Sequence, residues 1–128
     1  MRSNPSNIIT LEAMTSKDTK TINSKQKGNQ FERQMAAILR ERIWPECYTS
    51  RFMGSAWDDY NGIDLTGTPG FNVQLKAMER TPPYHRILKD KMPQDTKTNI
   101  IIHKRNNEGC IVAISFDDFL KLVKCPSK

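Results

Sequence analysis

The chain has 128 residues, which is enough for one domain with a modest hydrophobic core. Its 20 basic residues outnumber its 14 acidic ones, and the net charge of +6 favours a polyanionic partner, either nucleic acid or an anionic membrane surface. No apolar run approaches the ~20 residues that cross a bilayer, and the N-terminus lacks the apolar segment of a secretory signal.

Three cysteines, Cys47, Cys110 and Cys125, are widely spaced and include no CxxC pair. This pattern indicates reduced thiols rather than a disulfide framework or a zinc site. We therefore expect a soluble protein of the cytoplasm that does not span a membrane.

Residues 1–25 are rich in Ser, Thr, Asn and Lys, which predicts a flexible polar and basic arm. A domain then follows over 26–128, and it opens with a helix over 26–44 that Pro45 ends. Glu32 lies at the edge of the apolar stripe of this helix. It is either half of a surface ion pair or an acid at the boundary of the interior.

The middle of the chain predicts a strand over 47–53, a polar loop over 54–62, and strands over 62–66 and 71–77 joined by a tight turn. Alternation in the last strand puts Gln74 and Lys76 on the face opposite its apolar residues. Asp64 occupies the corresponding face of the preceding strand. An acid, an amide oxygen and an ammonium would then meet on one side of a hairpin, as in a site for metal and phosphate; the alternative is a hairpin whose polar face meets water.

The C-terminal half predicts a short helix, two strands and a last amphipathic helix. Pro82 and Pro83 open the short helix, and its inner side carries Tyr84, Ile87, Leu88 and Lys91. An apolar strand over 99–103 and a partner strand over 110–116 flank a basic turn, and a capping box over 115–118 starts the last helix. The order α-β-β-β-α-β-β-α predicts an α/β fold with a mixed sheet between helices.

This arrangement resembles the PD-(D/E)XK nuclease superfamily, and more narrowly the Holliday-junction-resolvase-like endonucleases of bacteriophages. The likeness covers roughly residues 27–124 and rests on a helix with an acid, Asp64, and Val73-Gln74-Leu75-Lys76 ten residues later. Two further segments, His103-Lys104-Arg105 after an apolar run and Asp117-Asp118-Phe119-Leu120, match the same pattern. The resemblance implies a restriction-endonuclease-like αβββαβ core.

It also implies roles for individual residues. Asp64, Gln74 and Glu32 would hold Mg²⁺, for which Mn²⁺ can substitute, and Lys76 would act on the scissile phosphate as the fourth catalytic residue. The side chains expected to face DNA are Arg51, Ser55, Arg80, Arg86, Lys89, Lys104 and Arg105.

The resulting hypothesis is a metal-dependent endonuclease that cleaves branched DNA in the cytoplasm, that of the host cell if a phage encodes it. Cutting two opposed strands needs two sites, so a homodimer is expected. Gln74 stands where a carboxylate is usual, which lowers the expected metal affinity and makes Glu32 more important. The alternative is a catalytically inactive DNA-binding or phage assembly protein on the same fold.

Overall fold

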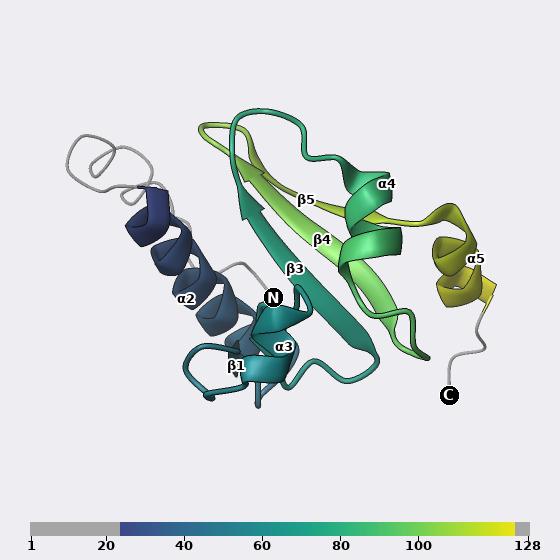
Figure 1. Cartoon of the computed structure of the whole chain (residues 1–128), viewed down its shortest axis with the longest axis horizontal. Coiled ribbons are helices and arrows are strands. Elements are labelled where there is room, and N and C mark those ends of the chain that lie inside the picture. Colours follow the sequence, from purple (N-terminus) through teal and green to yellow (C-terminus); the bar gives the residue numbers. More distant parts are fainter. Residues whose placement is uncertain (1–23, 125–128) are drawn as a thin grey trace.

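The computed structural model describes residues 24–124, in which helices flank a five-stranded mixed sheet (Figure 1). The elements are α2 Ser24–Arg42, β1 Tyr48–Thr49, α3 Ala56–Tyr60, β2 Leu65–Thr66, β3 Phe71–Ala77, α4 Tyr84–Arg86, the π-helical turn η1 Ile87–Lys91, β4 Thr98–Arg105, β5 Gly109–Ile114 and α5 Phe116–Lys124. The predicted arm over 1–25 lies outside the described residues except for its last two, which already belong to α2. No helix of the described part is long and apolar enough to cross a bilayer.

The strands lie in the order β1-β2-β3-β4-β5, and only β3 and β4 run parallel. The α4–η1 segment carries the chain from the end of β3 back to the start of β4, which is the crossover that a parallel pair needs. In this pair Gln74 lies opposite Ile101, and Lys76 lies opposite His103. The mixed α/β architecture is confirmed.

One face of the sheet is covered by α2. The buried side chains of Phe31 and Met35 pack with Val73 and Leu75, two of the apolar residues that alternation had placed opposite Gln74 and Lys76. The remaining buried members of this core are Ala36, Cys47, Leu65, Ile100 and Ile102.

The opposite face is covered by α4 and η1. Ile87 and Met92 pack on Ile101, with Tyr84 and Leu88 at the margin. Lys91, predicted on the inner side, is exposed. The segment closes a π-helical turn with hydrogen bonds five residues apart, so the i, i+4 spacing from Ile87 to Lys91 does not keep both side chains on one face.

Two expectations between α2 and β2 were wrong. The predicted strand over 47–53 is reduced to Tyr48–Thr49, because the chain turns at Ser50 and continues through Gly54 at φ 68°. The predicted loop over 54–62 contains the short helix α3, and the Ser55 hydroxyl accepts a hydrogen bond from the Asp58 amide at 3.4 Å. This segment therefore holds a compact turn and helix beside β2.

The C-terminal elements lie at the edge of the sheet farthest from β1. β5 pairs only with β4, and α5 lies beyond the end of β5, on the side away from α2 (Figure 1). The predicted capping box is confirmed in part, since the Ser115 hydroxyl accepts the Asp118 amide at 3.1 Å.

Candidate functional site

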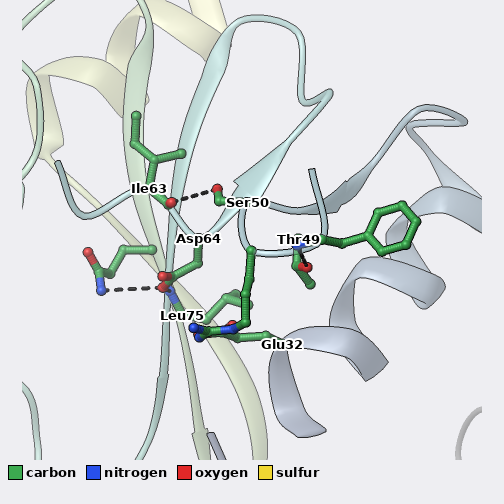
Figure 2. Close-up of polar contacts among 9 residues, drawn as sticks. Glu32, Thr49, Ser50, Ile63, Asp64 and Leu75 are labelled. Atoms are coloured by element: carbon green, nitrogen blue, oxygen red, sulfur yellow. Dashed lines mark hydrogen bonds and ion pairs between the residues drawn. The ribbon is translucent and has the colours of Figure 1, made fainter. Parts of the chain in front are cut away.

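The candidate site lies where β2 and β3 begin to separate, and we call this place the fork. Asp64 directly precedes β2, and both its backbone amide and its backbone carbonyl make hydrogen bonds to neighbouring segments. Its amide donates to the Val73 carbonyl at 2.8 Å, and its carbonyl accepts the Ser50 amide at 2.9 Å. The Ser50 hydroxyl also donates to the Ile63 carbonyl at 2.7 Å (Figure 2). The position of Asp64 is therefore set by the turn after β1 as well as by β3.

The Asp64 carboxylate points at β3. Its Oδ2 accepts the Leu75 amide at 2.7 Å and the Gln74 side-chain Nε2–H at 3.3 Å (Figure 2). The first of these bonds is short and charge-assisted, and it holds a half-buried carboxylate in one orientation. The structure thus brings together two residues that the sequence pattern had paired.

Gly62 makes room for the Gln74 amide. It adopts φ 75°, and a Cβ at this position would lie 2.8 Å from Gln74 Oε1 and 2.7 Å from the Lys91 carbonyl oxygen. The end of η1, Gly62 and the Gln74 side chain therefore meet at one point. Sequence reasoning missed this role, although a glycine two residues before Asp64 was the available signal.

Lys76 is two residues beyond Gln74 on β3 and shares its face. Its side chain is half-buried, and among residues 24–124 no hydrogen bond or ion pair engages its ammonium. The positive charge at this end of β3 is therefore available to an external anion.

His103 is the neighbour of Lys76 on β4 and is buried. Its Nε2 donates to the Met78 carbonyl at 2.8 Å, and its Nδ1 lies 2.9 Å from the Tyr84 hydroxyl. Because a carbonyl can only accept, the neutral ring carries its proton on Nε2 and accepts the tyrosine hydroxyl. His103 thus connects Tyr84 of α4 to Met78, the residue directly after β3, through hydrogen bonds.

Glu32 reaches the fork through Arg51. The Arg51 Nη2 donates to Glu32 Oε1 at 3.2 Å, and Arg51 directly follows Ser50, whose amide binds Asp64. Figure 2 shows Glu32 extending from α2 toward the strand that carries Leu75. The Glu32 carboxylate is thus occupied by a side chain that had been assigned to DNA.

The oxygen ligands of Asp64 and Gln74 suit a magnesium site in which phosphate oxygens of a substrate would supply further ligands. Within residues 24–124, no three His, Cys, Asp or Glu side chains gather as a metal-binding group. Asp64 and Gln74 nevertheless supply a carboxylate and an amide oxygen on adjacent strands, and a half-turn of the amide would present that oxygen beside the carboxylate. Mg²⁺ commonly takes only one or two carboxylates and fills its shell with water and phosphate oxygens.

The other residues assigned to DNA lie on several elements. Arg80, Arg86 and Lys89 are exposed after β3 and along α4 and η1. Arg105 donates to the Thr81 hydroxyl at 3.2 Å. Ser55 uses its hydroxyl at the start of α3.

Lys104 departs from the expectation that it lies around the same face as Lys76. It is buried, and it follows Ile100 and Ile102 along the β4 face that packs against α2. Burial lowers the pKa of its ammonium, an effect increased by the charge of Lys27 and opposed by those of Cys110 and Glu79.

Aromatic residues beside the fork are also exposed. Phe52, Trp57 and Tyr60 lie between β1 and Asp64 with most of each side chain in solvent. Trp44, by contrast, packs on Phe71 with ring centroids 5.6 Å apart. Trp44 is therefore a packing residue, whereas Trp57 is exposed to solvent.

Comparisons of the chain with protein-family models, curated proteins and solved structures found no match. The fold and the fork define an α/β protein in which a carboxylate directly before β2 contacts an amide of β3, with an ammonium on the same face of that strand. The functional conclusion depends on this chemistry and on the sequence resemblance.

Proposed function

We propose that the chain is a Mg²⁺-dependent DNA endonuclease of the PD-(D/E)XK type, which hydrolyses phosphodiester bonds in branched duplex DNA as a Holliday-junction-resolvase-like homodimer. The observation that carries the proposal is the contact between Asp64 and Gln74 at 3.3 Å, with Lys76 on the same face of β3. The element order adds support. Apart from the short helix α3 between β1 and β2, a helix, three antiparallel strands, a helical crossover and a parallel strand follow one another as in the αβββαβ core that the resemblance implies.

Each residue of the fork has a distinct role in this proposal. The oxygens of Asp64 and Gln74 would hold Mg²⁺, which supplies Lewis-acid stabilisation of the phosphate and activates a water when it is bound. The Lys76 ammonium stabilises the negative charge that develops on the phosphate oxygens. The Leu75 amide keeps the Asp64 carboxylate oriented before substrate arrives.

In this proposal, DNA breaks the ion pair between Glu32 and Arg51. Half of the Arg51 side chain is exposed, at 52%, and an ion pair at such a position is worth only about 0–1 kcal/mol. Rotation of Arg51 onto a DNA phosphate would therefore cost little and would release the Glu32 carboxylate toward the fork.

A neutral Gln74 predicts weak metal binding in the absence of DNA. Two unit charges 4 Å apart interact by roughly 4 kcal/mol at an effective dielectric constant of 20, and an amide forgoes this attraction although it is cheaper to desolvate. Substrate phosphates would supply the missing negative charge. We therefore expect tight metal binding only in the complex with DNA.

The test is a cleavage assay on labelled four-way junctions, flaps and linear duplexes, with and without Mg²⁺ or Mn²⁺. We expect cutting of branched DNA only with metal, and a loss of about a thousandfold in Asp64→Asn, which keeps an acceptor for the Leu75 amide. Asp58→Asn changes a nearby acid on α3 and is the matched control. Cleavage by Asp64→Asn at the wild-type rate would remove the assignment.

A second candidate is a DNA-binding protein on this fold without catalytic activity. It is favoured by the orientation of Gln74, which donates an N–H to Asp64, and by the lack of a three-acid group in the described part of the chain. This protein would bind branched DNA and leave it intact with either metal. In both cases binding should weaken with salt, log K falling by about 0.9 per phosphate contact for each unit of log salt concentration.

A further inference from the structure

The surface formed by β5 and α5, residues 109–124, is apolar, and apart from Ala113 and Ile114 it has little cover within the described chain; we call it the C-terminal face. No residue of α5 is buried, and this helix makes no extensive packing contact with any other described element. Its large exposed apolar side chains are Phe116, Phe119, Leu120, Leu122 and Val123. An amphipathic helix of this kind normally buries its apolar stripe.

β5 extends the uncovered surface. Ile111 and Val112 point to opposite faces of the sheet, yet both are more than half exposed. Their partners on β4, His103 and Ile102, are buried, and on β5 the cover supplied by α2 and by α4–η1 reaches only Ala113 and Ile114. The outer edge of β5 also has no neighbouring strand in the described sheet, and such an edge favours pairing with another chain.

We infer that the C-terminal face is a twofold interface with a second copy of this chain, in which the two α5 helices pack antiparallel. The charges of α5 favour a second copy of the chain as the partner. Asp117 lies in its first turn and Lys124 in its last, seven residues apart and so on the same flank of the apolar stripe. A twofold axis between antiparallel helices brings Asp117 of each copy beside Lys124 of the other, so the surface complements itself.

The size of the surface suits a dimer. The five apolar side chains of α5 and one of the two exposed side chains of β5, each roughly half exposed, offer on the order of 500 Å² per copy, to which the backbone edge of β5 adds. A stable interface of ordinary size buries about 800 Å² per partner. The C-terminal face would supply the interface of the homodimer in the proposed function, but it is argued from exposure and charge and does not depend on the metal site at the fork.

The first test measures molar mass by sedimentation across a concentration series of the full chain. We expect a dimer for the wild type, and a rise of about a hundredfold in the dissociation constant for Val123→Asp. Ile43→Asp is the matched control, because Ile43 is exposed to the same degree, 60% against 64%, and lies outside the C-terminal face. Circular dichroism at low concentration verifies that both variants fold.

Two results would overturn the inference: a wild-type chain that stays monomeric up to about 100 µM, or a Val123→Asp variant that dimerises like the wild type. A monomer would leave residues 1–23 or another protein as the cover of α5. A monomer would also remove the homodimer from the proposed function, whereas the metal-dependent cleavage assay with Asp64→Asn tests the fork separately from this face.

A second test addresses the antiparallel arrangement. Lys124→Glu places two acids together in its own homodimer, and Asp117→Lys places two bases together in the other. A mixture of the two chains restores both opposite-charge pairs. We expect the mixed dimer to form about tenfold more tightly than either variant alone, and less so in high salt. Equal association in the mixture and in the separate variants would overturn the antiparallel pairing.

Discussion

The fork and the C-terminal face lie at different parts of one sheet and are built in opposite ways. At the fork, polar side chains find partners inside the chain: Asp64 accepts two N–H groups, and Glu32 is paired with Arg51. At the C-terminal face, the large apolar side chains of α5 are exposed and not buried among the described residues. The fork is therefore oriented before any ligand arrives, whereas the C-terminal face acquires its packing only when something covers it.

Two phenylalanines express this difference most sharply. Phe31 on α2 is 1% exposed and packs in the core beneath the fork, whereas Phe116 on α5 is 71% exposed. We expect Phe31→Ala to lower the free energy of unfolding by about 3–5 kcal/mol, as deletion of a buried aromatic ring does. Phe116→Ala should change that of the monomer by less than about 0.5 kcal/mol.

The measurement is urea unfolding at a protein concentration low enough to keep the chain monomeric. A large loss of stability in Phe116→Ala under these conditions would mean that α5 packs on its own chain. The contrast between the two regions would then disappear.

Two lysines allow a finer comparison. Lys76 keeps its ammonium available at the fork, whereas Lys104 on the next strand is buried and its pKa is lowered by that burial. Lys104→Met removes the desolvation of a charge that lowers this pKa, so we expect its stability relative to the wild type to be greater at pH 7 than at pH 10.5, a gain of about 0.5–1 kcal/mol. Lys89→Met, on the exposed side of η1, is the control and should change little.

The pH dependence of this gain follows from the direction of the shift. A lowered pKa means that the folded state holds the Lys104 proton less tightly than the unfolded state, whose lysine titrates near 10.5. The burial cost is therefore present at neutral pH and is relieved as the pH rises toward 10.5. A stability difference between variant and wild type that does not shrink in this window would contradict the assigned cause.

Local patterns in the sequence were enough to predict most of the fold. The alternation of Val73 and Leu75 with Gln74 and Lys76 gave β3 its buried and polar faces, and Pro45 marked the limit of the first helix. The helix α3 was missed because five residues hold no apolar stripe, and the first strand was drawn too long because its end depends on a bond from Ser50 to Asp64.

For the candidate site, the sequence predicted which residues lie close together but not the contacts that they make. Period-two alternation placed Asp64, Gln74 and Lys76 on one side, and the structure brings the first two into contact. The pairing of Arg51 with Glu32 and the burial of Lys104 depend on the register between distant elements, which no local pattern contains. The exposure of the apolar stripe of α5 could not be predicted either, because amphipathicity indicates that a helix face is buried but not which element or partner covers it.

The fork is tested most directly by calorimetric titration of Mn²⁺ into the wild type, Asp64→Asn and Gln74→Glu, each bound to an uncleavable branched DNA. We expect one site per chain in the wild type, binding at least tenfold weaker in Asp64→Asn, and binding about tenfold tighter in Gln74→Glu, where a second carboxylate joins the first. The same affinity in all three proteins would show that the ion binds elsewhere, and the proposed nuclease site would be refuted.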